Sequence, residues 1–449
     1  MMILWIAGSA PLMLLMLNKA RTKARWFMKT RYHSLYFASI GPIQACIALY
    51  ALATAFYSRD TRRSQLHKLV RSYFGTGQIL AYSSGRGSIT AFLSAAGVGP
   101  KSSVLLSSFT CLAVPTAVLA AGSKPIYADI NTSSLNVDFS AIKNAIQDDT
   151  KVIVVQHTMG RPVDDINEIC EFAKKKNILV IEDCALSLGT LNKGLPLGQS
   201  GDAAIFSLEL SKTLSAGWGG ILLNNNKKLE SALAVCYERT TEESSLIVLR
   251  KLLQIVTTGF LYEKHVYFFG KYIVSLGYKL KLFKGSTPEH ESHGKVSHNF
   301  VSRLSGGQAK LAISQFKRIN EVASLNNRNL LYLQKCLKDS GLKVLGAASK
   351  EDFPVSPRVA FLVNDPHAAS EWFYRKGIEL GRWFDGSLSS LPIFNFDIGQ
   401  FPNVRIIANH IVNLPCHNRL TESDLVWINN NIQMFVKENP SQCDFRLNK

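Results

Sequence analysis

The chain has 449 residues and a formal net charge of +18, which is enough length for a sizeable core and more than one domain. Its eight cysteines show no close pair and no metal-ligand spacing, which argues against a disulfide framework and for a reducing compartment. Residues 1–75 contain eleven Lys or Arg and residues 246–285 contain seven, with one acid in each segment. Because both segments are also rich in large apolar residues, they favour an anionic membrane surface over nucleic acid, for which the sequence shows no motif.

The first seventeen residues carry no charge and precede a basic run, Asn18–Arg31. A membrane span takes about 20 residues, so the length leaves open whether residues 1–17 cross the membrane or lie on it. A secretory signal places its charges before the apolar core, whereas here they follow it. The order therefore predicts that residues 1–33 are a membrane anchor and its basic flank, with the catalytic part facing the cytoplasm. A second apolar run, Leu35–Tyr57, has basic flanks on both sides, which favours a helix of the folded part over a second span.

Short apolar runs then alternate with helical patterns, which predicts a mostly parallel sheet. The first run, Ile79–Tyr82, leads into the glycine-containing turn Ser83–Ser88 and an apolar helix through Ala96. Backbone N–H groups at such a turn can approach a phosphate, and the helix terminus favours negative charge. The three-glycine spacing of a dinucleotide-binding turn is absent.

The most informative stretch is the run Ile178–Ile181 and the residues that follow it. This buried-type strand ends at Asp183, and ligands of open α/β sheets bind at the carboxyl ends of strands. The next strand-like run delivers Ser207, and Lys212 follows five residues later, before the glycine-rich turn Gly217–Gly220. A carboxylate, a hydroxyl and a lysine at one sheet edge suit pyridoxal 5′-phosphate (PLP), because a lysine can form a Schiff base and a carboxylate can hold the pyridinium nitrogen protonated.

These motifs resemble those of the DegT/DnrJ/EryC1/StrS aminotransferases, which are PLP enzymes of fold type I. The matching positions are Glu182–Asp183, Phe206–Ser207, Lys212 and Gly217–Gly220. The resemblance extends from about Gly41 to about Leu420 and implies a large PLP-binding domain over residues 34–320 and a smaller C-terminal α/β domain over residues 321–449.

The resemblance also implies roles for individual residues. Lys212 is the expected catalytic lysine. The expected cofactor-binding residues are Asp183, Ser207, Gly85, Arg86, Gly87, Ser88, Cys111 and Arg303. Arg303 is expected to reach the cofactor phosphate of the partner in a homodimer. The sequence departs from the family pattern at Cys111, Leu186, Trp218 and Val301, where the family has an aromatic residue, Gln or His, Glu and Asn.

Residues 246–285 predict one or two helices, because leucines recur at helical spacing and are followed by aromatic residues interleaved with lysines. This composition is typical of a helix that lies on a membrane surface. A helix at a dimer interface is the alternative. The stretch Gly285–His298 predicts a loop.

The sequence therefore predicts a membrane-associated, PLP-dependent aminotransferase. Its substrates would be an amino donor such as glutamate and a keto-sugar on a nucleotide or lipid carrier, in polysaccharide or secondary-metabolite biosynthesis. Two alternatives remain: a PLP enzyme of different chemistry, such as condensation or dehydration, and a non-catalytic membrane scaffold on a decayed PLP fold.

Overall fold

The computed structural model describes residues 32–35, 39–54, 59–283, 285, 301–347 and 351–443. Almost all of the predicted anchor, up to residue 31, and almost all of the predicted loop at residues 285–298 lie outside the described residues. The strands are β1 (Gln78–Tyr82), β2 (Ser103–Ser107), β3 (Lys124–Ala128), β4 (Thr150–Gln156), β5 (Leu179–Asp183), β6 (Leu191–Asn192), β7 (Leu195–Pro196), β8 (Ala203–Ser207), β9 (Gly220–Asn224), β10 (Val344–Leu345), β11 (Arg358–Leu362) and β12 (Ile411–Pro415). The helices are α2 (Pro42–Ala53), α3 (Arg59–Phe74), α4 (Gly85–Ala95), α5 (Ala113–Ala120), α6 (Phe139–Ala145), α7 (Ile166–Lys175), α8 (Glu230–Arg239), α9 (Ser245–Leu261), α10 (Tyr267–Lys279), α12 (Gly306–Phe316), α13 (Ile319–Asp339), α14 (Pro366–Arg375), α15 (Pro402–His410) and α16 (Glu422–Glu438).

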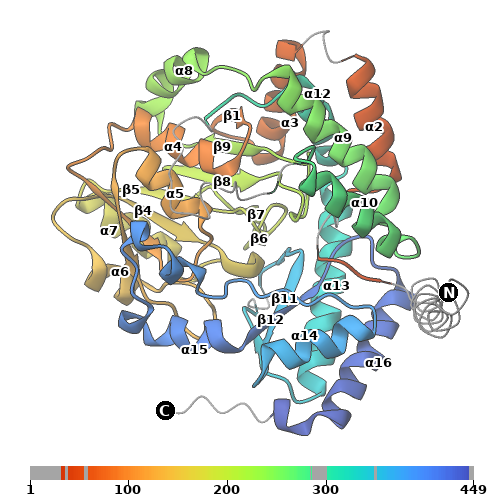
Figure 1. Ribbon diagram of the computed structural model, residues 1–449. Coiled ribbons are helices and arrows are strands. Elements are labelled where there is room, and N and C mark those ends of the chain that lie inside the picture. The colour runs from red at the N-terminus through yellow and green to blue at the C-terminus, as the bar shows by residue number, and fades with distance from the viewer. Residues whose placement is uncertain are drawn as a thin grey trace, which may run out of the picture.

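The centre of the molecule is a seven-stranded sheet in the order β1-β9-β8-β5-β4-β2-β3 (Figure 1). The pairs β8–β5, β5–β4, β4–β2 and β2–β3 are parallel, whereas β9 runs antiparallel to both of its neighbours. The prediction of a mostly parallel central sheet is therefore confirmed. Its register places Gln156, the last residue of β4, beside Asp183, the last residue of β5.

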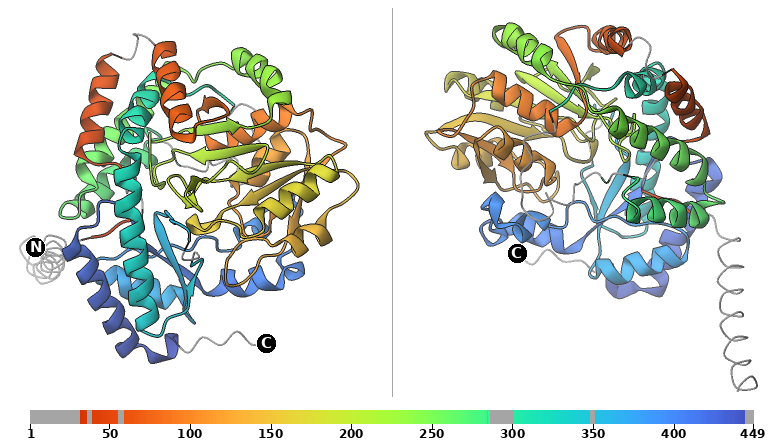
Figure 2. Two further views of the ribbon diagram at one scale, coloured as in Figure 1. Left: turned by 180° about the vertical axis from the view of Figure 1, so that it is seen from behind. Right: turned by 45° about the horizontal axis from the view of Figure 1, so that its top comes forward.

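Helices cover both faces of this sheet. Successive residues of a strand point to opposite faces, so neighbouring residues pack in different cores. Phe206 of β8 packs in a core formed with α2, α3, α9 and α12. Its neighbour Ile205 packs in a second core formed with α4, α5 and α8. The two views in Figure 2 show the helices in front of and behind the strands. Strands buried on both faces explain why the sequence shows continuous apolar runs there.

The smaller C-terminal region is a three-stranded antiparallel sheet, β10-β11-β12, packed against α13, α14 and α16. α13 crosses the domain boundary expected at residue 320. Its first turn, with Ile319 and Val322, packs in the core of the large domain, and Leu330 and Leu333 pack in the core of the small one. One continuous helix therefore joins the two domains.

Two apolar segments that bear on the membrane predictions are described. The run Leu35–Tyr57 contributes α2, whose small residues Ala45, Ala48 and Ala51 are buried. The segment predicted as one or two helices at residues 246–285 forms two, α9 and α10. Within the described parts of the chain, every helix is too short or too polar to cross a membrane.

The close contact between α2 and α9 predicts a stability effect. A Cβ atom on Gly259 of α9 would lie 2.8 Å from the carbonyl oxygen of Gly41 and 2.9 Å from the Cβ of Ala45. Because such overpacking costs about 1–3 kcal/mol, we expect Gly259→Ala to lower the free energy of unfolding and the Tm. Gly99→Ala is the matched control, since nothing lies within 4 Å of its added Cβ. Equal Tm values for the two variants would contradict this packing.

Candidate active site

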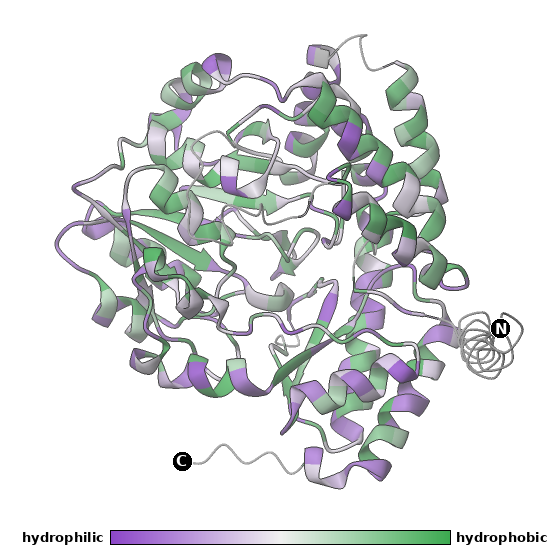
Figure 3. Ribbon diagram, in the orientation of Figure 1, coloured by the Kyte–Doolittle hydropathy of each residue, from purple (hydrophilic) through white to green (hydrophobic). Residues whose placement is uncertain are grey.

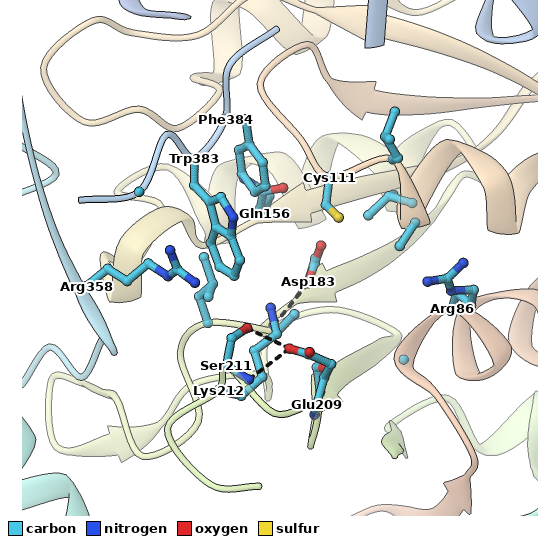
Figure 4. A pocket seen from close by; sticks show the side chains of 18 of the residues that line it. Arg86, Cys111, Gln156, Asp183, Glu209, Ser211, Lys212, Arg358, Trp383 and Phe384 are labelled. Atoms are coloured by element: carbon cyan, nitrogen blue, oxygen red, sulfur yellow. Dashed lines mark hydrogen bonds between the residues drawn. The ribbon is translucent and has the colours of Figure 1, made fainter. Parts of the chain in front are cut away.

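A cavity of about 560 Å³ lies at the carboxyl ends of β4, β5 and β8, and both domains contribute to its wall (Figure 4). The sequence-predicted site residues that line it are Gly85, Arg86, Cys111, Asp183, Ser207 and Lys212. Gly87 and Ser88 lie behind it in the first turn of α4, and Arg303 lies outside it. The cavity is lined also by residues that the sequence analysis did not single out, among them Gln156, Glu209, Arg358, Glu379, Trp383 and Phe384.

Asp183 is a buried carboxylate at the base of the cavity. Its Oδ1 accepts a hydrogen bond of 3.0 Å from the backbone N–H of Ala185. Burial raises the pKa of Asp183, while this N–H and the positive charge of Lys212 act in the opposite direction. An ionised carboxylate in such a place is costly unless a cation or hydrogen-bond donors compensate it. The site therefore favours a ligand that brings a positively charged N–H group to Asp183.

The neighbouring Glu182 points away from the cavity and holds the fold together. Its Oε1 accepts hydrogen bonds of 2.7 Å from the backbone N–H groups of Ser200 and Gly201, and its Oε2 lies 2.9 Å from Nε2 of His157. The Nδ1 atom of His157 accepts from the N–H of Val163, so Nε2 carries the proton and donates to Glu182. Each polar atom of this buried pair has a partner inside the protein.

Glu182 and His157 also lie within metal-binding distance of Cys184. Burial raises the pKa of the Cys184 thiol well above its usual value, and the thiolate is the form that ligates metals. With the imidazole and the carboxylate already satisfied by each other and by backbone groups, this cluster is a structural one.

The loop that carries Lys212 is fixed by hydrogen bonds on both sides of the lysine. Oε2 of Glu209 accepts from the N–H and the hydroxyl of Ser211 at 2.9 and 2.6 Å. The hydroxyl of Ser39 lies 2.6 Å from the carbonyl oxygens of both Lys212 and Thr213. The side chain of Lys212 extends into the cavity, with Nζ 4.9 Å from the centre of the Trp383 ring. The backbone is thus held while the amine remains at the cavity surface.

At another side of the cavity, the start of α4 forms an anion-binding corner. The hydroxyl of Ser84 caps the helix by accepting from the N–H of Gly87 at 3.1 Å. Gly85 faces Ser207, and a Cβ atom on Gly220 would lie 2.6 Å from the backbone nitrogen of Gly85. Glycine at position 220 therefore lets β9 approach the helix start. The helix N-terminus, the hydroxyl of Ser207 and the guanidinium of Arg86 together suit a phosphate.

The small domain closes the opposite side with a stacked arginine and tryptophan (Figure 4). The guanidinium carbon of Arg358 lies 3.3 Å from the centre of the Trp383 ring, and Arg358 is almost completely buried. The side-chain oxygen of the buried Asn413 accepts a hydrogen bond of 2.7 Å from the backbone N–H of Trp383. A Cβ on Gly381 would lie 2.7 Å from Arg358 Nη1 and 2.8 Å from Cδ1 of Leu35, so a larger residue there would displace one of these side chains. One signal in the sequence could have pointed to Arg358: it is the first residue of the otherwise apolar strand β11.

The chain near its N-terminus also contributes to the cavity wall. His33 forms a parallel bridge with Ile378 of the small domain. The hydroxyl of Ser34 and the N–H of Leu35 donate to Oε2 of Glu379 at 2.7 and 3.0 Å. Leu35 and Glu379 both line the cavity. This pairing was not predicted, because a stretch as short as residues 33–35 has no periodicity that would reveal it.

The positions that depart from the family pattern occupy different places. Cys111, Leu186 and Trp218 line the cavity, whereas Val301 packs in the core beneath α4. Arg303 pairs through its backbone with Tyr82 at the end of β1. Its role toward a partner subunit stays a prediction.

Comparison with known proteins identifies the family that the sequence motifs resemble. A sequence model of the DegT/DnrJ/EryC1/StrS aminotransferase family matches residues 48–433. Protein MosB of Rhizobium meliloti is 38% identical over 160 residues, which are 36% of this chain and 31% of MosB. The L-glutamine:scyllo-inosose aminotransferase of Streptomyces griseus is 29% identical over 177 residues, which are 39% of this chain and 42% of that enzyme. These alignments thus span less than half of either relative.

The fold is shared with solved structures. The sugar aminotransferase CalS13 of Micromonospora echinospora superimposes with a TM-score of 0.66 at 20% identity, over 89% of this chain and 99% of that one. At this identity the likeness concerns the fold alone.

The different surroundings of Glu182 and Lys212 predict a large effect on stability for the first residue and a small one for the second. We expect Glu182→Ala to lower the free energy of unfolding by about 3–5 kcal/mol, because it leaves buried donors without their acceptor. We expect Lys212→Ala to lower it by about 1 kcal/mol or less, since the amine lies at the cavity surface and Asp183 keeps the N–H of Ala185 when it loses this charge. Chemical denaturation of both variants measures this. A Glu182→Ala protein of unchanged stability would show that the buried pair is dispensable to the fold.

Proposed function

The chain belongs to the DegT/DnrJ/EryC1/StrS aminotransferase family, and from this premise we propose that it transfers an amino group from an amino acid to a keto-sugar. The enzymes of this family depend on PLP, the cofactor that the sequence predicts. The observation that carries the proposal is the placement of Asp183 and Lys212 in one cavity with the anion-binding corner at the start of α4.

The residues present fit PLP chemically. Asp183 is a buried carboxylate that benefits from a protonated ring nitrogen, and the start of α4 with Ser207 and Arg86 suits the phosphate. Lys212 is the one lysine among the described residues that line the cavity. When bound, the cofactor acts as an electron sink that makes the proton on the carbon next to the substrate nitrogen removable.

Lys212 has two tasks in this proposal. Its amine would hold the cofactor covalently in the resting enzyme, and once the donor replaces the amine in that bond, Nζ would be free to take the proton from the α-carbon of the donor. In the second half of the reaction, Nζ returns a proton to the carbon of the acceptor that gains the amino group. The loop hydrogen bonds at Glu209 and Ser39 fix the position of the lysine backbone for both tasks.

Arg358 is the residue that we propose binds the carboxylate of the amino donor. It lies across the cavity from Arg86, stacked on Trp383 (Figure 4). An arginine offers two parallel donors that match a carboxylate, and stacking on an indole restricts its orientation in advance. Two arginines on opposite sides thus divide the cavity into a phosphate side and a carboxylate side.

We propose a cyclic keto compound of the sugar class as the acceptor, because the related Streptomyces griseus enzyme is named for transfer from L-glutamine to scyllo-inosose. A nucleotide or a lipid carrier would present it. We further propose a homodimer, in which Arg303 reaches the partner's site, and attachment to the cytoplasmic side of a membrane. The uncharged first seventeen residues and the basic run after them support the attachment.

The cofactor assignment predicts a direct chemical test. The purified protein should absorb in the visible, and borohydride should fix the cofactor to Lys212, as mass spectrometry of the peptides would show. Adding glutamate or glutamine without acceptor should shift the absorbance, because the amino group moves to the cofactor. A fixed cofactor with no shift for any amino acid would favour condensation or dehydration chemistry, and the absence of bound cofactor would favour the scaffold alternative.

The two arginines predict separable kinetic effects. A charge-assisted hydrogen bond contributes about 1.5–3 kcal/mol, which corresponds to roughly ten- to hundredfold in an equilibrium constant. We expect Arg358→Leu to raise the KM of the amino donor by that factor while the Kd of PLP stays unchanged, and Arg358→Lys to restore part of the loss. Arg86→Thr should instead raise the Kd of PLP. The reverse assignment of the two effects would overturn the division of the cavity.

A further inference from the structure

The outer sides of α9 and α10 expose an unusual amount of apolar surface. On α9 the exposed large apolar residues are Leu246, Leu249, Leu253 and Phe260, and those on α10 include Phe269, Tyr272 and Leu276. Their spacing of three, four and seven residues places each set along one side of its helix. We call these seven residues the α9–α10 face. In Figure 3 α9 is largely green, and α10 has green segments between pale and purple ones.

This face is separate from the side by which the helices pack on the protein. Leu252 and Ile255 of α9 are buried, and Ile255 reaches the turn at Gly217, where an added Cβ would lie 2.4 Å from its Cδ1. On α10 the buried residues include Tyr267 and Val274. A helix that only covers a core needs one apolar side. Packing on the protein therefore does not explain the second, exposed apolar side, which favours contact with another apolar phase or molecule.

The charge around the face has one sign. Between Ser245 and Phe283 the sequence contains a single acid, Glu263, and that carboxylate is bound by Arg419. The basic residues of the same segment include Arg250, Lys271, Lys279 and Lys281. Apolar and aromatic side chains flanked by lysines are typical of helices that lie at an anionic membrane surface.

The N-terminal segment joins the fold at the start of α10, on the side by which this helix packs on the protein. The ring of Tyr32 stacks on Tyr267 of α10 with 4.0 Å between centroids. The backbone N–H of Tyr32 donates to the carbonyl oxygen of Lys264. The chain that precedes Tyr32 therefore continues from the start of α10.

We propose that the α9–α10 face docks on the anionic surface of a lipid bilayer, as a second contact beside the N-terminal segment. A second copy of the chain is a poorer occupant, because a two-fold interface would bring two basic surfaces together. Trp218 lines the cavity and lies 5.5 Å from Nζ of Lys251, which is on the inner side of α9. Docking would thus hold the cavity about one helix diameter, ~10 Å, from the lipid.

The test uses the full-length protein in vesicles that contain a photoactivatable phospholipid, with labelled peptides mapped by mass spectrometry. We expect label in residues 245–283 as well as in the N-terminal segment when phosphatidylglycerol is present. In pure phosphatidylcholine, the label in residues 245–283 relative to the N-terminal peptides should fall at least roughly tenfold, as expected when several basic residues lose an anionic surface. Label confined to residues 1–31, or independent of anionic lipid, would overturn the proposal.

A matched pair of variants tests the residues themselves. Phe269, Tyr272 and Leu276 are 63%, 71% and 44% exposed, and Leu195, Val235 and Val426, on other surfaces, are 65%, 46% and 51% exposed. Changing the first three to serine should reduce the label in residues 245–283 several-fold, whereas changing the second three should leave it unchanged.

Tm and cofactor absorbance of each variant show whether the fold and the proposed chemistry survive, so a failure of docking is distinguishable from a failure of the enzyme. Lys279→Glu with Lys281→Glu provides a second route, with the same loss of label expected. Cross-links that join the α9–α10 faces of two copies would identify a subunit interface and contradict the lipid assignment.

Discussion

The buried carboxylate of Asp183 is the group on which the arrangement of the cavity depends. A negative charge at the end of a central strand is tolerable only where cations and N–H dipoles surround it. Parallel pairing of β4, β5 and β8 brings the ends of these strands to one edge, and there the protein supplies the N–H of Ala185 and the amine of Lys212. The neighbouring Glu182, one residue earlier and on the other side of the strand, accepts hydrogen bonds from backbone N–H groups and from His157. Of the two adjacent carboxylates, Glu182 therefore stabilises the fold, and Asp183 lines the cavity, where we propose that it binds the cofactor.

Both domains line the cavity, although the residues that we propose recognise the cofactor come from one of them. The large domain supplies Asp183, Lys212 and the start of α4, and the small domain supplies Arg358 and Trp383. The continuous helix α13 fixes the two bodies relative to each other, since its ends lie in different cores. The side of the cavity that we assign to the amino donor is therefore set by domain packing rather than by a local motif.

The sequence was most informative about those cavity residues that lie close together along the chain. Asp183, Ser207 and Lys212 lie within thirty residues of one another, and strand ends and glycine turns mark their places. Arg358 and Trp383 were missed because their meeting with Lys212 results from long-range packing, which no periodicity encodes. Glu379 was missed because it joins the cavity through its pairing with residues 34–35. The apolar and basic character of residues 246–285 was evident, but only the structure separates the buried side of α9 and α10 from the exposed one.

The pairing of residues 33–35 with the segment at Ile378 and Glu379 has a practical consequence for preparing the protein. The proposed membrane attachment would be probed with a shortened protein that lacks the apolar N-terminus and its basic flank. If the cut is made after Leu35 rather than before Tyr32, the shortened protein also loses an edge of its cavity and two hydrogen bonds to Glu379. Low turnover of such a protein would then report a damaged pocket wall, and would be mistaken for a requirement for lipid.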